Sequence, residues 1–559
     1  MNLEQLRKII AGGETLKVEF KGESRRQMSD GDIYEEIVAL ANTEGGVLIL
    51  GVEDDGKVTG ARPRHGIKTE PLRLQSAIFN NTVPSLSTRA IVLVLAGKDV
   101  LCVEAEPCSE PCATTAGKSL RRTLKADGKP QSVPFYPREQ QSRRIALGTL
   151  DYSAQKLPDA AFEDFDPLEI ERLKQNVSAL RGDASLLSLN DKELAKALRL
   201  VETESGRLVP TVAGLLLIGR EDAIRRHIPT HAVHFQVLDR NGNVKVNDAF
   251  CCGILKVISE ISSRFAARNE EKEVAVGMFR LPIPDYSAEA FREASNNALL
   301  HRDYSRMDGI YIQWQHDHLL ITSPGGFPCG VTISNLLVHE PKPRNSRLAE
   351  AFKRIGLVEQ TGRGVDKIFM GQLRYGRPVP DYSRSDETGV RLVLRGGAES
   401  LDFAAFVYEQ EKAESPLSLD ELLVLNTLFF ERTIDSELAG GLIQKGAPEA
   451  RAVLNSLVEK GFIEAKGETR GRTYHLGSRL YRKFGKKAEY VRAHGISAHK
   501  HEAIVMEYVE AHGRIERKAV MSLCGLTGIQ ARRLLKRMCL NKKLIMRGRL
   551  PGGAYYEKL

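Results

Sequence analysis

The sequence predicts a multidomain α+β fold, and three observations support this prediction. At 559 residues the chain is longer than one hydrophobic core normally accommodates, so several domains are expected. Helical and strand patterns alternate through the first 60 residues and again from about Leu208. After about Gly396 the pattern changes to short amphipathic helices followed by basic hairpins. The expected domains are an N-terminal head (1–155), a helical linker (156–205), a middle domain (206–398) and two tail domains (399–490 and 491–559).

The charge balance favours a polyanionic partner. The net charge is +9 and the pI about 9.0. From Arg514 to Lys558 there are 12 Lys and Arg residues and only two Asp and Glu residues. This concentration indicates that the C-terminal end binds nucleic acid, with DNA as the expected partner and RNA as the alternative.

The same composition indicates a cytoplasmic protein without a membrane anchor. No run of about 20 apolar residues is present, and the N-terminus lacks the apolar core of a secretory signal. The eight cysteines follow no disulfide framework and are expected to be free thiols.

The head begins with patterns typical of a small α/β unit. Residues 17–20 alternate as a strand does, and residues 32–40 form an amphipathic helix. The apolar run 47–52 predicts a buried central strand, and the Asp-Gly turn at 54–57 predicts a hairpin. Gly45 and Gly46 precede the central strand, where small residues allow a close approach of two backbones.

The segments GETLKVEFKGE and EEIVALANTEGGVLILGVEDDGKVTG resemble the Schlafen/AlbA-2 family. In nuclease members of that family, acidic residues of this region form a metal-binding cluster. The resemblance implies Glu14 and Glu19 as two of these positions, with Asp54 or a neighbouring acid (Glu53 or Asp55) as the third. Such a cluster would hold Mg²⁺ or Mn²⁺. The structural alternative is that Glu19 pairs with Lys21 and the head binds nucleic acid or a partner without cleavage.

The middle domain is expected to start near Leu208, with strands at 213–218 and 232–238. Its most informative segment is a predicted helix over 291–304, with Ser287 as a plausible N-cap. Glu293, Asn297 and His301 recur every four residues and therefore share one helical stripe. An acid, an amide and an imidazole suit a site in which Glu orients a water and Asn holds phosphate-bound Mg²⁺.

Two glycine-rich turns follow this helix. The first is the segment 323–330, which contains Gly325 and Gly326, and the second is 356–365, with a helix between them. Backbone N–H groups of such turns are able to surround phosphates.

This order of motifs over residues 206–395 resembles the divergent ATPase domain of helicase-related transcriptional regulators that carry an AlbA-2 head. That domain is a variant of the Bergerat (GHKL) ATP-binding α/β sandwich. The resemblance implies Glu293 as general base and Asn297 as Mg²⁺ ligand, and it places further nucleotide contacts at His301, Ser323, Gly325, Gly326, Gly362, Arg363 and Gly364. Ser323 stands near the position where the fold normally has an adenine-recognising Asp. The structural alternatives are a degenerate scaffold and, for His301, a satisfied helix-end histidine.

The tail resembles two winged helix-turn-helix domains. In the first, helices are expected at 419–428, 436–443 and 449–461, followed by a wing with a basic loop. In the second, the third helix is expected at 529–540. Basic side chains on a third helix and wing suit groove entry and phosphate contacts. The candidate nucleic-acid contacts are Arg470, Arg472, Arg532, Arg533, Lys536, Arg537, Arg547 and Arg549.

Three functions fit these patterns. The leading hypothesis is an ATP-binding, DNA-binding transcriptional regulator in which nucleotide controls assembly, as a dimer or higher homo-oligomer, or DNA engagement. One alternative is an ATP-gated, metal-dependent Schlafen-type nuclease in anti-phage defence. The other is a non-catalytic adaptor. The sequence leaves open whether ATP is hydrolysed.

Overall fold

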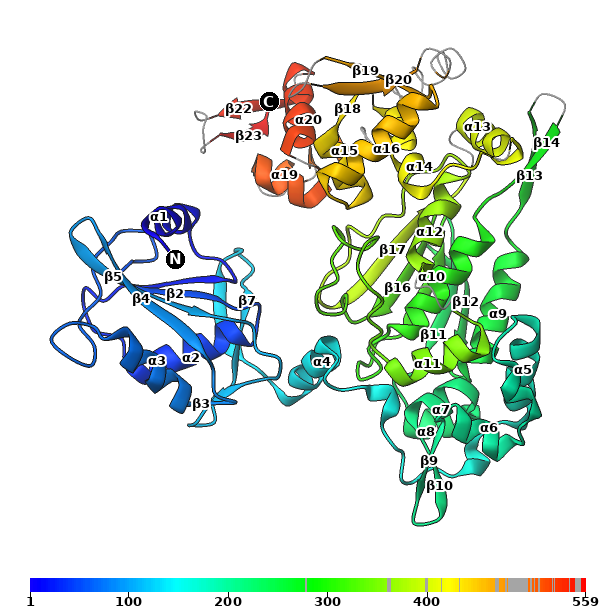
Figure 1. Ribbon diagram of the computed structural model, residues 1–559, viewed down its shortest axis with the longest axis horizontal. Helices are drawn as coiled ribbons and strands as arrows, with labels where there is room; N and C mark the ends of the chain where they lie inside the picture. Colours follow the sequence, from blue (N-terminus) through cyan, green and yellow to red (C-terminus); the bar gives the residue numbers. More distant parts are fainter. Residues whose placement is uncertain are drawn as a thin grey trace. The chain divides into compact units, whose positions relative to one another are not determined.

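The chain folds into two compact units, Met1–Tyr152 and Ser153–Leu559 (Figure 1). The computed structural model describes residues 1–276, 279–358, 363–397, 401–413, 415–431, 433–467, 472–477 and 480, and, nearer the C-terminus, 501–502, 505–506, 508–510, 513–524, 526, 528–541, 543–547 and 554–559.

The head unit is built on a four-stranded sheet of order β1-β2-β5-β4. The strands are β1 (Val18–Lys21), β2 (Gly46–Leu50), β4 (Thr88–Leu95) and β5 (Lys98–Ala105). β1 and β2 are parallel, and the other pairs are antiparallel. A Cβ on Gly46 would lie 2.1 Å from the Lys17 carbonyl oxygen, so the expected close backbone approach is confirmed here.

Helix α2 (Asp30–Ala41) supplies much of the head's core. Ser29 caps its N-terminus, and Ile33, Ile37 and Leu40 are fully buried. They pack with buried residues of β2 and β5 in one apolar cluster. The remaining head elements are α1 (Leu3–Gly12), α3 (Pro71–Asn80), β3 (Thr82–Val83), β6 (Ala113–Thr114), β7 (Leu120–Leu124), β8 (Pro130–Pro134) and α4 (Pro137–Leu147).

The second unit contains a five-stranded sheet of order β12-β11-β15-β16-β17. Its strands are β11 (Val233–Leu238), β12 (Val244–Phe250), β15 (Ile310–Trp314), β16 (His318–Pro324) and β17 (Gly389–Arg395). Val233, Phe235, Ile310 and Ile312 are buried, whereas the residues between them are half-exposed. One face of the sheet is therefore covered and the other is open.

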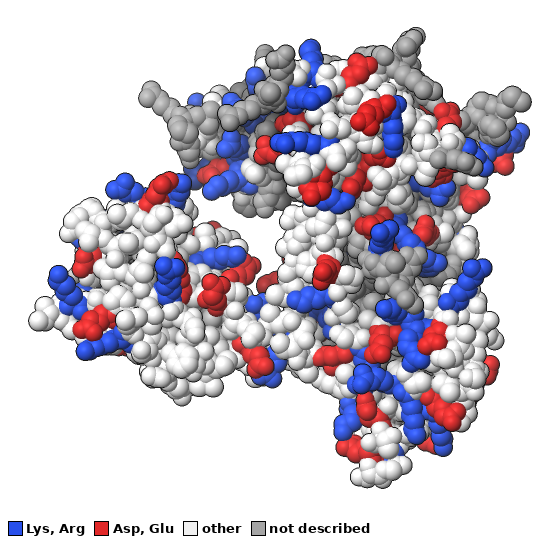
Figure 2. Space-filling model, viewed as in Figure 1, with Lys and Arg blue, Asp and Glu red and all other residues white. Residues whose placement is uncertain are grey.

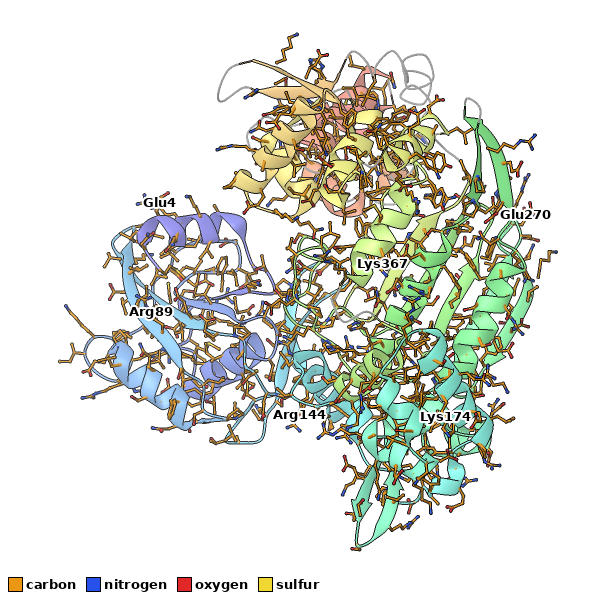
Figure 3. All side chains as sticks on the ribbon, turned by 45° about the vertical axis from the view of Figure 1, so that its right-hand side comes forward. Glu4, Arg89, Arg144, Lys174, Glu270 and Lys367 are labelled. Atoms are coloured by element: carbon orange, nitrogen blue, oxygen red, sulfur yellow. The ribbon has the colours of Figure 1, made fainter. Side chains whose placement is uncertain are left out.

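Helices α9 (Ile254–Ala266), α10 (Ala288–Leu300) and α12 (Gly364–Leu373) pack side by side, with α10 in the middle and against β16 (Figure 1). An ion pair of 3.3 Å between Lys367 and Glu289 joins α12 to α10, and Figure 3 labels Lys367 on α12. The hairpin of β13 (Glu271–Val276) and β14 (Phe279–Pro284) leads into α10. This arrangement is an α/β sandwich, as the sequence predicts for the middle domain.

Residues 153–230 are mainly helical, and one expectation is wrong there. The sequence predicts a strand over the apolar run 213–218, but this run belongs to α7 (Val212–Ile218), capped by Thr211. Every residue of α7 is buried, so its sequence shows neither helical nor strand periodicity. Helix α5 (Pro167–Ala179) packs against α7, α9 and α11 (Ser346–Ile355). Nearby elements are α6 (Asp191–Ala197), α8 (Glu221–His227), β9 (Val201–Glu204) and β10 (Arg207–Pro210).

After α13 (Leu401–Lys412), the tail holds two small modules. The first tail module (residues 418–477) has a three-stranded sheet of order β18-β20-β19, and the second (residues 501–559) one of order β21-β23-β22. The first comprises α14 (Leu419–Phe430), β18 (Ile434–Asp435), α15 (Ser436–Ile443), α16 (Ala447–Glu459), β19 (Ile463–Lys466) and β20 (Thr473–Leu476). The second includes β21 (Arg514–Glu516), α19 (Arg517–Cys524), α20 (Gly528–Leu540), β22 (Leu544–Arg547) and β23 (Tyr555–Lys558). The winged-helix assignment of these modules stays a prediction.

A search of the described residues found no helix with both the length and the apolarity needed to cross a membrane.

Candidate nucleotide site

A cavity of about 360 Å³ lies between α10, the N-terminus of α12 and the loop that follows β16. Seven of the residues predicted as nucleotide contacts line it: Glu293, Asn297, His301, Ser323, Gly325, Gly326 and Gly364. Apolar side chains such as Ile321, Tyr382 and Leu392 form its floor. A mainly apolar cavity with a few convergent polar groups is the usual form of a small-molecule site.

Helix α10 brings Glu293 and Asn297 to the cavity wall. Ser287 caps the helix by accepting a hydrogen bond from the Ala290 N–H, as expected. Glu293 is only 2% exposed and lies 3.1 Å from the Arg292 guanidinium. A Cβ placed on Gly364 would lie 3.0 Å from Glu293 Oε2 and 3.8 Å from Asn297 Nδ2. The first turn of α12 therefore lies directly against the acid and the amide.

His301 terminates α10 as its C-cap residue and lines the cavity. Its Nδ1 is shielded from solvent and accepts or donates no hydrogen bond among the described residues. Burial, reinforced by the nearby Arg344 guanidinium, lowers the pKa of His301 to about 4. The imidazole is therefore neutral at pH 7 and offers a ligand a hydrogen bond rather than a positive charge.

Ser323 and the following glycines form the second wall. The Ser323 hydroxyl donates a 2.7 Å hydrogen bond to the Ala298 carbonyl. Only the lone pairs of its oxygen therefore remain to accept a hydrogen bond from the base of a bound nucleotide. Gly325 has φ +89°, and a Cβ there would lie 2.7 Å from the Cβ of Asp303. A Cβ on Gly326 would lie 2.6 Å from the Asp386 carbonyl oxygen. Both glycines are therefore required by the backbone of this turn.

Sequence reasoning missed Arg344, which supports this turn from behind. Arg344 is 3% exposed, donates to the Gly326 carbonyl and lies 4.0 Å from the Asp303 carboxylate. Burial lowers the pKa of its guanidinium, with the Asp303 carboxylate opposing that effect. The clue in the sequence is an arginine beside prolines at 341–344, which local patterns alone do not mark as buried.

The third wall carries positive groups. Arg363 is the N-cap residue of α12 and is exposed, whereas Gly362 lies outside the described residues. Lys342 and Lys353, which no sequence pattern singles out, line the cavity from the loop and from α11. Together with the N-terminal N–H groups of α12, they give this wall the charge that an anionic ligand needs.

These walls fit a nucleoside triphosphate with its Mg²⁺. The apolar floor suits a base, and the lysines and the α12 N-terminus suit phosphates. Asn297 is the residue that the sequence predicts as Mg²⁺ ligand, and one protein ligand would suit Mg²⁺, which commonly keeps several waters and takes further oxygens from substrate phosphates. A search of the described residues found no group of three or more His, Cys, Asp or Glu arranged to hold a metal alone.

The head carboxylates predicted as a nuclease cluster lie near one another but are engaged differently. Glu19 pairs with Lys21 and, at 2.5 Å, with the buried Arg122. Glu14 accepts a 3.0 Å hydrogen bond from the Phe20 N–H. Burial raises the pKa of Glu14, and the nearby Glu19 and Asp54 carboxylates add to the effect. The pairing of Glu19 with Lys21 is the one that the structural alternative expects.

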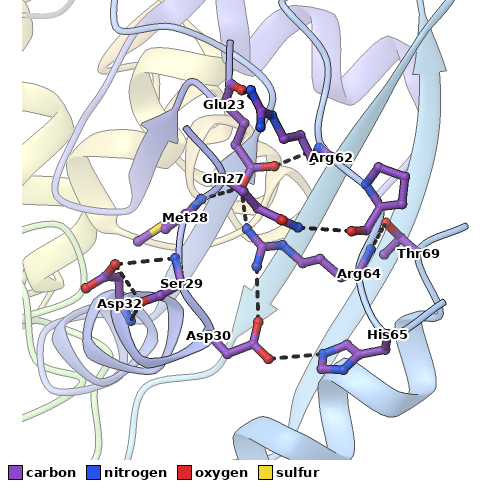
Figure 4. A network of polar contacts seen from close by, with 11 residues as sticks. Glu23, Gln27, Met28, Ser29, Asp30, Asp32, Arg62, Arg64, His65 and Thr69 are labelled. Carbon is purple, nitrogen blue, oxygen red and sulfur yellow. Dashed lines mark hydrogen bonds and ion pairs between the residues drawn. The ribbon is translucent and has the colours of Figure 1, made fainter. Parts of the chain in front are cut away.

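A second buried network, shown in Figure 4, braces the loop after β1. Glu23 is 1% exposed and accepts hydrogen bonds from the Met28 and Arg62 backbone N–H groups. The Arg64 guanidinium pairs with Glu23 and, at 3.0 Å, with Asp30. The loop between Glu23 and Asp30, which exposes two further arginines at 25 and 26, is thereby held to the 62–65 segment.

The predicted nucleic-acid contacts differ between the two tail modules. Arg532, Arg533, Lys536 and Arg537 are all exposed on α20, and Arg537 also pairs with Glu502 at 3.0 Å. Arg547 is exposed on β22, 3.6 Å from Glu557. In the first module Arg472 is exposed and stacks over Tyr474, with 5.5 Å to the ring centroid. Arg470 and Arg549 lie outside the described residues.

Figure 2 shows Lys and Arg interspersed with Asp and Glu over the visible face. The net charge of +9 is therefore not gathered into one broad basic surface on that side. The basic helix α20 is a local feature of the second tail module, because α16 in the first presents Glu449 and Glu459 beside Arg451.

Comparison with known families defines two of the domains. Residues 14–131 match the family model "Schlafen, AlbA_2", and residues 308–394 match "Putative ATP-dependent DNA helicase recG C-terminal". The chain therefore carries a Schlafen/AlbA_2 domain in its head and an ATPase-like domain around the cavity, as the sequence resemblance implied. Residues 144–234 match a domain of unknown function, DUF8451.

Among solved structures, the chain is similar to the DIP2311 protein from Corynebacterium diphtheriae. The two share 23% sequence identity with a TM-score of 0.51, over 87% of this chain and 98% of that one. At this identity the likeness concerns the fold alone. No curated protein matched the chain.

Proposed function

We propose that this protein is an ATP-binding, DNA-binding regulator in which nucleotide controls DNA engagement. The observation that carries the proposal is the cavity in which Glu293, Asn297 and the N-terminus of α12 meet. The match of residues 308–394 to an ATPase-like family supports a nucleotide as the ligand.

In this proposal each wall has one task. The apolar floor holds the base, and Lys342, Lys353 and the N-terminal N–H groups of α12 hold the phosphates. Bound Mg²⁺ would neutralise phosphate charge, with Asn297 as its protein ligand. Glu293, buried beside Gly364, orients a water at the phosphate end of the cavity.

The DNA-binding part of the proposal rests on the tail. Four exposed cationic side chains on the 13-residue helix α20 suit phosphate contacts along a duplex. We assign the two tail modules to the winged helix-turn-helix class, because each ends with a helix followed by an antiparallel hairpin.

The test is DNA affinity measured by fluorescence anisotropy on the full chain, without nucleotide, with ADP and with a non-hydrolysable ATP analogue plus Mg²⁺. The proposal predicts a nucleotide-dependent affinity that Asn297→Ala abolishes. DNA binding that ignores nucleotide in the wild type would contradict regulation by the cavity.

A further inference from the structure

The turn between α15 and α16 of the first tail module contacts a loop that lines the cavity. The Gln444 side chain accepts a 2.7 Å hydrogen bond from the Leu337 N–H and donates a 2.8 Å hydrogen bond to the Ile333 carbonyl. The loop containing Ile333 and Leu337 also contributes Val331 and Leu336 to the cavity wall. The Gln444 side-chain amide thus joins the first tail module to this cavity-lining loop.

The backbone at Gln444 marks this contact as a specific one. Gln444 is the C-cap residue of α15 and has φ +57°, in the left-handed region. Glycine or asparagine usually occupies such a position, because other side chains are strained there. A glutamine at this place costs stability that glycine would not, and its side chain makes both hydrogen bonds to the loop.

The next residue approaches a second wall of the same cavity. Lys445 pairs with Asp420 of α14 at 2.5 Å. The charges of Lys445 and Asp420 both act on the Asp366 carboxylate, in the first turn of α12. Burial raises the pKa of Asp366, while the positive charges of Arg363 and Lys445 oppose that shift. Its neighbours Gly364 and Val365 line the cavity. The turn is therefore hydrogen-bonded to the cavity-lining loop through Gln444, and its Lys445 charge acts through space on Asp366 at the N-terminus of α12.

The mixed charges on the outer surface of α16 indicate that the first tail module has a role other than binding a polyanion. Its exposed charges are mixed, with Glu449 and Glu459 beside Arg451 and Lys460, whereas α20 exposes four cationic residues. A module whose α16 surface carries mixed charges, and which is hydrogen-bonded to a cavity-lining loop, is suited to transmit the occupancy of the cavity.

We propose that Gln444 and Lys445 couple occupancy of the nucleotide cavity to the position of α16. This inference rests on the proposed function, because it requires a nucleotide in the cavity. The bonds from Gln444 hold the 331–340 loop in its cavity-lining position before the ligand arrives, which reduces the ordering that binding requires. A ligand that moves this loop or the α12 N-terminus moves the α15–α16 turn with it.

The test is hydrogen exchange across the full chain, with and without a non-hydrolysable ATP analogue and Mg²⁺. In the wild type, the analogue is expected to slow exchange in both 331–340 and 436–460. Gln444→Asn tolerates the left-handed backbone but is one methylene shorter. In this variant the protection of 436–460 is expected to disappear, and ATP affinity to fall about tenfold.

Two further variants sharpen the result. Gln444→Glu keeps the acceptor for the Leu337 N–H but sets a carboxylate oxygen against the Ile333 carbonyl oxygen, so it should lose the protection of 436–460 as Gln444→Asn does. Asn455→Ala removes an exposed amide on α16 and should behave as wild type.

The outcomes separate the two proposals. Analogue binding that protects 331–340 but leaves 436–460 unchanged in the wild type would overturn the coupling and leave the nucleotide site standing. If the analogue protects 436–460 in Gln444→Asn as strongly as in the wild type, Gln444 does not take part in the coupling. No effect of the analogue anywhere would overturn the proposed function and the coupling together.

Discussion

The carboxylate of Glu293 lies so close to Gly364 that a Cβ on Gly364 would be only 3.0 Å from Glu293 Oε2. Gly364 opens α12 without a left-handed φ, so alanine is compatible with its backbone. Gly364→Ala is therefore expected to fold normally and to displace the carboxylate. ATP turnover should fall about tenfold, equivalent to about 1.4 kcal/mol of barrier, as measured by phosphate release.

The matched control is Gly441→Ala, whose added Cβ meets nothing within 4 Å. It should leave turnover unchanged and stabilise α15 by about 0.5–1 kcal/mol. Wild-type turnover in Gly364→Ala would show that the position of the Glu293 carboxylate is not critical.

The lowered pKa of His301, whose Nδ1 is shielded from solvent, predicts a pH-dependent stability. The pKa of His301 is about 4 in the folded protein, below the value near 6.5 of an unfolded chain. Between pH 6.5 and 4, His301 is protonated in the unfolded chain but stays neutral in the folded chain. The free energy of unfolding therefore falls as the pH falls through this window.

His301→Asn should remove about 2 kcal/mol of the stability difference between pH 7.5 and pH 5.0, as measured by chemical denaturation. His231, fully buried with a pKa of about 3, and His234, whose pKa is also lowered by burial, are unaffected and provide further dependence of the same sign. An unchanged pH profile in the variant would mean that His301 is protonated in the folded state near pH 6.

In the head, Arg122 is buried beside Glu19 and also donates a 2.9 Å hydrogen bond to the Thr15 carbonyl. Arg122→Ala leaves the buried Glu19 carboxylate with Lys21 as its remaining ion-pair partner among the described residues, and it is expected to destabilise the head by about 3 kcal/mol. Faster hydrogen exchange in β1 and β2 of the full chain would report this. Lys118→Ala, which breaks an exposed pair with Glu35, should leave this exchange unchanged, because solvent screens such a pair.

The tail offers a comparison of two helices in one chain. Replacing Arg532, Arg533 and Lys536 with alanine should weaken DNA binding. The slope of log K against log salt should become shallower by about 0.9 for each DNA phosphate that the variant no longer neutralises. Arg451→Ala on α16 should change neither the affinity nor the slope. Equal effects from the two helices would contradict the assignment of DNA binding to the second module.

The sequence predicted local elements well wherever their residues alternate between buried and exposed sites. α15 was predicted with its observed bounds, and α20 within one residue. The 213–218 segment failed because every side chain is buried, which removes the periodicity that separates helix from strand.

For the cavity, the spacing of Glu293, Asn297 and His301 was enough to place them together, because residues four positions apart lie on the same face of a helix. Arg344 and Gln444 could not be found in this way. Each acts through partners far away in the sequence, Arg344 on the Gly326 carbonyl and Gln444 on the 333–337 loop. Only the folded chain brings those partners together.

The central claim, that the cavity is an ATP site, is tested most directly by calorimetric titration of the full chain with ATP and Mg²⁺. The wild type is expected to bind one ATP per chain. Asn297→Ala is expected to lose at least about 1.4 kcal/mol, a tenfold weakening, with an unchanged melting temperature. No heat of binding in the wild type, or equal affinity in Asn297→Ala, would contradict the assignment of this cavity to ATP.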